Sequence, residues 1–231
     1  MAVPQLRFAH LPTPVETVPR LSDALGGARL LIKRDHQTGL AFGGNKTRKL
    51  EFLIAEAREQ GAKTLISGGA LQSNHCRQTA AVAARFGFEC ILVLSGDKSQ
   101  RASGNLLVDR LFGAEIVYVA DRKDRACILR ETFERAMKDG KKPYLVPYGG
   151  SNATGALGYA FAMKELIDQK VSADWIVFGL DRLDLSGWDE RIRKSKGDVS
   201  YLAGTKKRSD SVIQLIFHKR GARTDDARAL F

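Results

Sequence analysis

The residues best suited to chemistry are two lysines, Lys46 and Lys49, in the stretch 43–52. Two glycines open this stretch and apolar residues then recur at helical spacing, which predicts a turn followed by a helix over about 47–60. Lys46 would lie at the helix N-terminus, and Lys49 one turn later on nearly the same side. Helix N-termini favour anions, so a lysine there is unusual unless its amine has a task. Lysines near other cations have a lowered pKa, and a neutral amine can form a Schiff base with a carbonyl.

Two other interpretations of this stretch stay open. The first is a solvent-exposed basic start of a helix, which is what most Lys-Thr-Arg-Lys runs are. The second is a phosphate-binding P-loop, because Gly39 and Gly44 have the spacing of that motif. The P-loop is disfavoured because Asn45 occupies the position where the motif requires lysine.

A second polar loop, residues 68–75, follows a predicted strand and leads into an alanine-rich helix over about 75–86. Ser73 and Asn74 are favoured helix caps, so plain capping is one interpretation. Alternatively the loop, with its two leading glycines and the helix behind it, holds an anion or a polar ring. His75 is either a titrating group or a packed, hydrogen-bonded histidine.

Short apolar runs alternate with helical patterns through the middle of the chain. They predict a parallel sheet covered by helices on both faces, hence an α/β fold. In such sheets ligands bind at the carboxyl ends of strands, where the loops 68–75 and 149–152 lie. The expected strands are 64–67, 89–94, 115–119, 144–147 and 175–178, and the expected helices are about 47–60, 75–86, 103–112, 123–138 and 155–168.

These features together predict a cofactor. A Schiff-base lysine, a second lysine and a Ser-Asn anion loop at one sheet edge fit a carbonyl compound that bears a phosphate. Pyridoxal phosphate is such a compound, because it binds a lysine and acts as an electron sink.

Composition excludes several other classes. Hydrophobic residues make up 44% of the chain, enough for a packed core. No apolar run approaches the about 18 residues of a membrane span, and the N-terminus lacks the pattern of a secretory signal. The cysteines, Cys76, Cys90 and Cys127, lack metal-ligand spacing. We therefore expect no metal, and free thiols in a reducing cytoplasm.

The net charge of +11 raises the possibility of nucleic-acid binding. Basic residues are nevertheless mixed with acidic ones and not interleaved with aromatic stacking platforms. The densest basic clusters, 191–196 and 206–208, lie near the C-terminus. A non-catalytic basic binding protein remains the alternative from a different functional class.

Several segments resemble the 1-aminocyclopropane-1-carboxylate deaminase / D-cysteine desulfhydrase family of pyridoxal-phosphate enzymes, which are of the tryptophan-synthase-β type. The resemblance covers roughly residues 6–178, and its first two motifs are long enough to be specific. The matching segments are 39–51, 72–81, 143–158, 12–14 and 32–35.

The resemblance implies a fold-type II enzyme with parallel sheets and helices on both faces. Its expected parts are an N-terminal arm with part of the large domain (1–45), a small cofactor-bearing domain (46–155) and the start of the return to the large domain (156–178). A homodimer is expected for the family.

By the same resemblance, Lys46 forms the Schiff base with the cofactor and later removes the proton at the substrate Cα. Lys49 helps to hold the phosphate, Asn74 bonds the ring hydroxyl, and Ser73 faces the substrate. Histidine at position 75 is similar to the desulfhydrases, whereas the cyclopropane deaminases more often carry glutamine there. The expected activity is α,β-elimination of D-cysteine; the alternatives are 1-aminocyclopropane-1-carboxylate deamination and cysteate sulfo-lysis.

The resemblance ends after residue 178. The glycine-rich loop that wraps the cofactor phosphate in the family has no counterpart, and 179–231 lacks the helix–strand alternation. We expect a poorly ordered, non-family tail, with the C-terminal part of the large domain missing, and therefore weak cofactor binding; both an active and an inactive enzyme stay open for this form. A shifted or truncated reading frame near codon 179 and a divergent tail with a new role are the two explanations.

Overall fold

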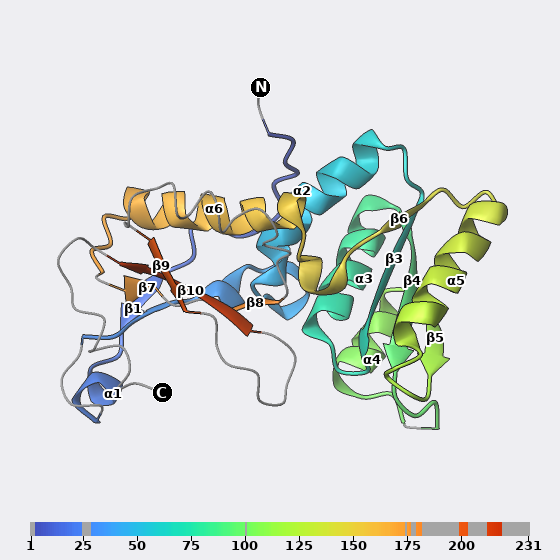
Figure 1. Ribbon diagram of the computed structural model, residues 1–231, viewed down its shortest axis with the longest axis horizontal. Helices are drawn as coiled ribbons and strands as arrows, with labels where there is room; N and C mark the ends of the chain where they lie inside the picture. The colour runs from blue at the N-terminus through green and yellow to red at the C-terminus, as the bar shows by residue number, and fades with distance from the viewer. Residues whose placement is uncertain are drawn as a thin grey trace.

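The computed structural model describes residues 3–24, 29–99, 101–173, 175–176, 179–181, 199–202 and 212–218. Within these ranges the chain forms one parallel sheet of four strands and two antiparallel sheets, of two and four strands. Figure 1 shows the parallel sheet on the right and the antiparallel sheets on the left. Helix α6 (Ala153–Asp168) runs along the top above the antiparallel sheets, and α2 (Lys46–Glu59) lies between it and the parallel sheet.

The parallel sheet has the strand order β5-β4-β3-β6. Every pairing in it is parallel, which confirms the α/β prediction. The predicted strands at 89–94, 115–119 and 144–147 are all present, with ends shifted by at most two residues. The strands are β3 (Thr64–Ala70), β4 (Glu89–Ser95), β5 (Glu115–Val119) and β6 (Pro143–Leu145).

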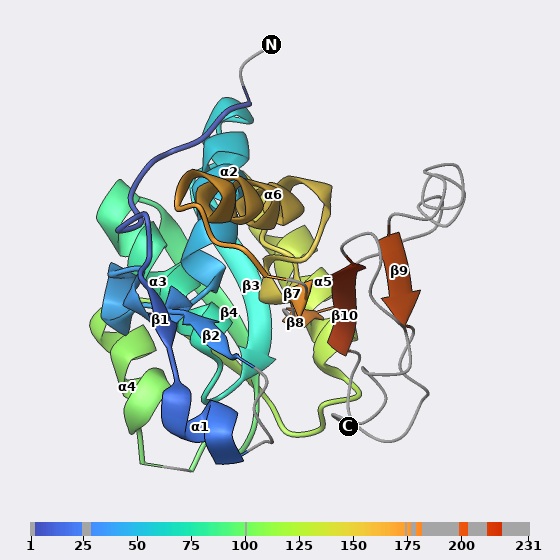
Figure 2. The same ribbon diagram turned by 90° about the vertical axis from the view of Figure 1, so that its left-hand side faces the viewer.

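Helices cover both faces of this sheet, as predicted. Helices α3 (Asn74–Phe86) and α4 (Gly104–Leu111) lie on one side, and α5 (Arg125–Lys138) lies on the other (Figure 2). Helix α2 packs on the same side as α3. The first turns of α2 and α3 therefore approach the sheet from one face, whereas α5 approaches it from the opposite face.

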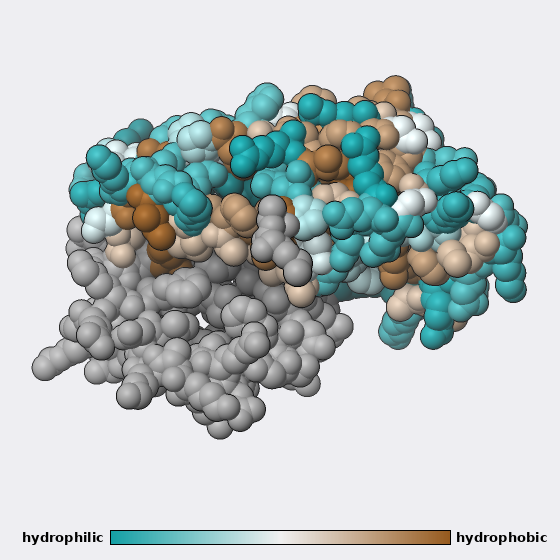
Figure 3. All heavy atoms as spheres, turned by 90° about the horizontal axis from the view of Figure 1, so that it is seen from above, coloured by the Kyte–Doolittle hydropathy of each residue, from teal (hydrophilic) through white to brown (hydrophobic). Residues whose placement is uncertain are grey.

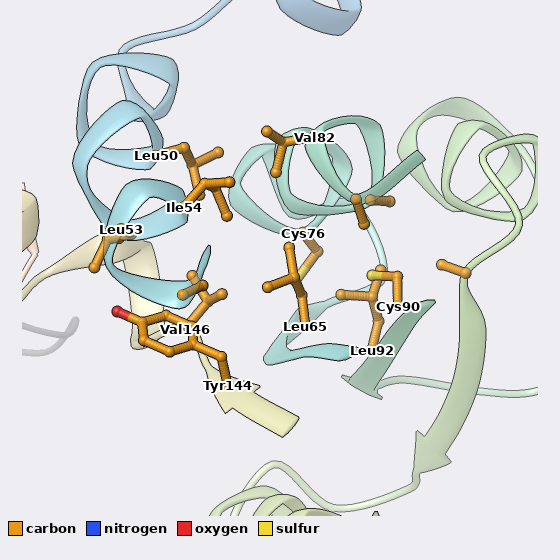
Figure 4. Packing of buried hydrophobic residues seen from close by; sticks show 14 of the residues in the cluster. Leu50, Leu53, Ile54, Leu65, Cys76, Val82, Cys90, Leu92, Tyr144 and Val146 are labelled. Carbon is orange, nitrogen blue, oxygen red and sulfur yellow. The ribbon is translucent and has the colours of Figure 1, made fainter. Parts of the chain in front are cut away.

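Side chains alternate between the two faces of the sheet along each strand, so the hydrophobic core has two parts. Leu65 and Leu92 face α2 and α3, in the cluster shown in Figure 4. Their chain neighbours Ile66 and Val93 face the opposite way and pack against α5. Successive strand residues point to opposite faces, so such runs are apolar throughout when both faces are covered. Full burial of each of these side chains stabilises the fold by about 1.5–3 kcal/mol.

The N-terminal arm and the C-terminal strands form the antiparallel sheets. The strand β1 (Val15–Thr17) pairs with β2 (Leu31–Lys33), and α1 (Pro19–Ala24) lies between them in the chain. In the other sheet the apolar run at 212–217 forms β10 and pairs with three short strands. The four strands of this sheet are β7 (Trp175–Ile176), β8 (Gly179–Asp181), β9 (Val199–Leu202) and β10 (Val212–His218).

The structure describes only parts of the predicted tail, residues 179–231. Residues 182–198, 203–211 and 219–231 lie outside the described residues, and so does the end of the strand predicted at 175–178. The domain boundaries expected from the sequence remain predictions.

The glycine pair after the predicted strand 64–67 does not end that strand. Gly68 and Gly69 continue β3 and pair with Val93 and Leu94 of β4. A Cβ atom on Gly69 would lie 2.6 Å from the sulfur of Cys76, so the missing side chain lets α3 pack closely against the strand end. The correction is that these glycines belong to the strand rather than to the following loop.

No helix in the described part of the chain is long and apolar enough to cross a membrane.

Candidate active site

A cavity of about 430 Å³ opens at the carboxyl ends of β3 and β4. Lys46, Ser73, Asn74 and His75 all line it, so the fold brings together four of the five predicted site residues. The charged side chains in its described lining are all basic, namely Lys46, Arg122 and Arg125. The cavity therefore favours anionic ligands.

The double glycine places Lys46 at the cavity by a turn that other residues cannot form. Gly43 has φ 73° and Gly44 has φ 134°, a region that residues with side chains avoid. A Cβ on Gly43 would lie 1.8 Å from the carbonyl oxygen of His36. Thr38 holds the turn, since its Oγ1 donates to the Gly44 carbonyl and accepts from the Gly44 N–H, at 2.7 and 2.9 Å. Lys46 then begins α2, as predicted.

Helix α3 ties this turn to the second polar loop. Gln78 donates its side-chain N–H to the Gly43 carbonyl and accepts from Thr47 Oγ1, both at 2.9 Å. Arg77 Nη2 also donates to the Gly43 carbonyl, at 2.8 Å. Sequence reasoning did not single out these two side chains. The available signal was their place in the segment 72–81, one turn after the loop.

Ser73 caps α3, and both Ser73 and Asn74 line the cavity. Ser73 Oγ accepts a hydrogen bond from the backbone N–H of Cys76 at 3.2 Å, which confirms the capping interpretation. Asn74 Oδ1 accepts from Arg77 and from Asn105, at 3.1 and 3.0 Å. The two interpretations of the loop are therefore compatible, because a capping residue here also faces the cavity.

His75 is held by hydrogen bonding to the sheet. Its Nε2 lies 3.0 Å from Ser67 Oγ, which itself donates to the carbonyl of Val146 at 2.9 Å. A hydroxyl has one proton to donate, so Nε2 is the donor in the contact with Ser67. The side chain is buried, which favours the packed, hydrogen-bonded interpretation over that of an exposed titrating group.

Lys49 is the predicted site residue that the cavity does not include. Its side chain is 1% exposed, and its Nζ donates to Ser151 Oγ at 2.9 Å and to the Gly149 carbonyl at 3.1 Å. These partners belong to the turn η3 (Tyr148–Gly150) and the residue after it. Lys49 thus supports the third predicted motif from behind, and its role toward a phosphate remains a prediction.

Arg125 forms part of the cavity wall that sequence reasoning missed. Its Nη1 donates to Ser95 Oγ at 3.0 Å, and its Nε donates to the Tyr148 hydroxyl at 3.2 Å. The guanidinium carbon lies 4.9 Å from the centre of the Tyr148 ring. Ser95 is the last residue of β4 and Tyr148 follows β6, so the position of these partners near strand ends was the only sequence signal available.

A buried ion network fixes the base of α2. Arg48, 2% exposed, donates to Asp35 and Glu165, and Lys33 lies 2.6 Å from Glu165. Burial alone would raise the pKa of Glu165, but hydrogen bonds from Arg48 and Lys33 outweigh it and lower the pKa to about 2. At Arg48, burial alone would lower the pKa, but the hydrogen bonds to Glu165 and Asp35 outweigh it and raise the pKa above its usual range. The arm, α2 and α6 are thereby joined behind Lys46.

The cysteines take no part in a metal site among the described residues. Cys76 and Cys90 are buried and Cys127 is exposed. Burial raises the pKa of Cys76 to about 12, although a side-chain hydrogen bond with Ser73 lowers it. Burial also raises the pKa of Cys90. The two buried cysteines therefore remain neutral thiols.

The fold and cavity define a class of protein that comparison with known families identifies. The model of the family described as pyridoxal-phosphate dependent enzyme matches residues 6–210, and the chain belongs to this family. D-cysteine desulfhydrases from two Klebsiella pneumoniae strains, MGH 78578 and 342, are 48% and 47% identical over 171 residues. Those matches cover 72% of this chain and 52% of each relative, so the chain spans about half the length of the curated relatives it matches.

Solved structures agree with this assignment. The crystal structure of a homologue of ACC deaminase has a TM-score of 0.69 and 36% identity, covering 74% of this chain and 52% of its own. Escherichia coli diaminopropionate ammonia lyase, in the apo form, has a TM-score of 0.54 at 18% identity, covering 71% of this chain and 50% of its own. The second likeness concerns the fold alone.

The residues at the cavity fit pyridoxal phosphate. The Lys46 amine lines the wall, the polar Ser73 and Asn74 lie nearby, and no carboxylate is present in the described lining. A Cβ on Gly68 would lie 3.0 Å from the Tyr148 ring, so the missing side chain lets this ring lie against the end of β3. A basic cavity with a lysine amine suits an anionic carbonyl compound.

Proposed function

We propose that this chain carries the lysine-bearing part of a pyridoxal-phosphate-dependent lyase that acts on D-cysteine. The observation that carries the proposal is the position of Lys46, which lines a basic cavity together with Ser73 and Asn74. The identity of 48% to D-cysteine desulfhydrase over these segments supports the choice of substrate. The reaction converts D-cysteine and water to pyruvate, sulfide and ammonia.

Each predicted residue that lines the cavity has a role that its position supports. Bound pyridoxal phosphate supplies an electron-withdrawing ring that stabilises negative charge at the substrate Cα. Lys46 carries the cofactor and takes the proton from Cα as a general base. Ser73 and Asn74, at the N-terminus of α3, orient the cofactor ring and the substrate. His75 fixes the loop from behind through Ser67.

Arg77 and Gln78 position these groups. Both donate to the Gly43 carbonyl, and Arg77 also holds Asn74. The turn that presents Lys46 and the loop that presents Asn74 are therefore kept in fixed register. Loss of register by about 1 Å is enough to lower catalysis by about a hundredfold.

The test is to supply D-cysteine to the chain loaded with pyridoxal phosphate and to measure sulfide and pyruvate. Formation of both in equal amounts, lost in a Lys46→Ala variant, supports the proposal. Absence of both products although cofactor is bound on Lys46 contradicts it. L-cysteine serves as the control for stereochemistry.

A second candidate is deamination of 1-aminocyclopropane-1-carboxylate. The likeness to a solved homologue of ACC deaminase, at 36% identity, supports it. Production of 2-oxobutanoate rather than sulfide distinguishes the two activities. Histidine rather than glutamine at position 75 favours the desulfhydrase. Sulfo-lysis of cysteate, tested by release of sulfite, is the remaining alternative.

We also propose that the protein acts in the cytoplasm as a homodimer. Two buried free thiols are consistent with a reducing compartment. The face that carries α2 and α6 has apolar patches among its hydrophilic residues (Figure 3), and Phe161 and Ile167 of α6 are 41% and 73% exposed. Sedimentation of the purified chain tests the dimer, and a monomer at all concentrations contradicts it.

A further inference from the structure

The cavity has a cationic wall on the side of α5, and the proposed function assigns no individual role to the arginines of that wall. We propose that Arg125 determines specificity by receiving an anionic group on the side chain of the substrate, such as a sulfonate or a carboxylate. This inference rests on the proposed pyridoxal-phosphate-dependent lyase activity at the same cavity, and among the candidate substrates it favours cysteate, which carries a sulfonate, over D-cysteine, whose side chain is a thiol.

The position of Arg125 follows from the two faces of the sheet. Lys46 and Ser73 reach the cavity from α2 and α3, on one face, whereas Arg125 comes from the first turn of α5, on the other. Groups that handle the cofactor and Cα are therefore separate from Arg125. A substrate held at Lys46 and Ser73 would extend its side chain toward the opposite wall.

The side chain of Arg125 is fixed in place. Ser95 and Tyr148 each accept one hydrogen bond from it, and the Tyr148 ring lies against the guanidinium. Ordering a long side chain in advance removes much of the entropy cost of binding a ligand. Arginine held in this way is suited to planar, two-point recognition of an oxyanion.

The guanidinium also has binding capacity left for a ligand. It carries five N–H donors, and its bonds to Ser95 and Tyr148 involve only Nε and Nη1. No ion pair joins Arg125 to a carboxylate within the described ranges. Arg122 lies on the same wall and adds a second positive charge. An anion brought by the substrate would complete this arrangement.

The first experiment measures protection of Arg125 in the unaltered full chain. The chain is loaded with pyridoxal phosphate, treated with phenylglyoxal, which modifies arginine, and mapped by mass spectrometry. Cysteate (sulfonate), aspartate (carboxylate) and serine (neutral) are compared as protecting ligands. We expect cysteate or aspartate to slow modification of Arg125 at least about fivefold, and serine to have little effect. Exposed Arg130 on the same helix should react equally throughout.

The second experiment measures affinity in variants. Arg125→Gln should weaken binding of the protecting anion at least about tenfold, as expected for loss of a charge-assisted bond, and leave serine unchanged. Arg125→Lys should restore part of the affinity, and Arg130→Gln should change nothing. Circular dichroism checks that the variants fold, and the protection experiment holds even where one does not.

The outcomes separate the inference from the proposed function. Protection by cysteate alone assigns a sulfonate, and protection by both acids assigns oxyanions in general. Equal protection by all three ligands, or none, while the cofactor is attached to Lys46, overturns the inference and leaves the proposed function standing. Failure of the cofactor to attach to Lys46 overturns both.

Discussion

Arg48 donates two hydrogen bonds to the carboxylate of Glu165, at 2.8 and 3.0 Å, across a separation of 117 residues in the chain. The pair joins α2, which begins at Lys46, to the far end of α6. Asp35 and Lys33 complete the network, so both carboxylates and both cations are compensated. The helix that carries Lys46 is thus anchored through Arg48, which belongs to the same motif, by carboxylates from two other segments.

Removing Arg48 should destabilise the fold strongly. Arg48→Met leaves Asp35 and Glu165 partly buried with less compensation, and we expect a loss of about 3–5 kcal/mol in the free energy of unfolding. The exposed ion pair of Lys164 and Asp168 on α6 is the matched control. Lys164→Met should cost no more than about 0.5 kcal/mol. Urea denaturation measures both, and similar losses in the two variants would contradict the role of the network.

The same network should give the protein an acid-sensitive step. The folded-state pKa of Glu165 is about 2, below the ordinary value of 4.5. A lowered carboxylate pKa stabilises the fold above pH 4.5, and that contribution is lost as the pH falls from 4.5 toward 2. Thermal unfolding as a function of pH should show this loss in the unaltered chain and a smaller one in Glu165→Gln. An identical slope in both would show that another carboxylate is responsible.

Asp109 on α4 should make the pH dependence of stability run in the opposite direction from that of Glu165. Its side chain is fully buried, neither carboxylate oxygen has a hydrogen-bond partner among the described residues, and burial raises its pKa to about 7 although Arg77 opposes the shift. The folded state therefore holds this proton more tightly than the unfolded one, so stability falls as the pH rises from about 4 to 7.

The expected consequence is that Asp109→Asn stabilises the protein at pH 8, by about 1–3 kcal/mol, and has little effect at pH 4. Urea denaturation at the two pH values measures the change. Glu115→Gln, an exposed acid at the start of β5, should show no such dependence. Destabilisation of Asp109→Asn at pH 8 would show that the charged form has a structural partner.

Alanine substitutions in two glycine turns can distinguish the cost of backbone strain from the cost of a steric clash of the added Cβ. Gly43 and Gly61 have similar positive φ values, 73° and 67°, but only at Gly43 would a Cβ collide with backbone. Gly61→Ala should cost about 1 kcal/mol, whereas Gly43→Ala should cost about 3 kcal/mol or more and displace Lys46. Equal costs would mean that the turn relaxes without disturbing its neighbours.

The sequence alone predicted the parallel sheet and its helices because both signals are local. The apolar runs of β3 and β4 and the helical spacing in α2 are set by burial on two faces, and each is visible within about ten residues. The strand end at Gly68 and Gly69 was missed, since glycine usually marks a turn. Only the packing of Cys76 against the strand shows why glycine stands there.

In the candidate site too, residues in local motifs could be predicted and residues joined only by the fold could not. Lys46, Ser73 and Asn74 lie in contiguous motifs and could be found from residue type and position. Arg125 and Ser95 meet only because β4 ends and α5 begins at the same edge of the sheet, and no local sequence pattern indicates this contact. Lys49 likewise points away from the cavity because its amine bonds to Ser151, which is distant in the sequence. Helical spacing alone does not predict such a contact.

The most direct test of the account is attachment of the cofactor to Lys46. The purified chain is mixed with pyridoxal phosphate, the Schiff-base absorbance band is recorded, and borohydride reduction is followed by mapping of the modified lysine. The account predicts a band and label on Lys46, with Lys49 unlabelled because its amine is buried against Ser151. No band, or label scattered over surface lysines, would contradict it.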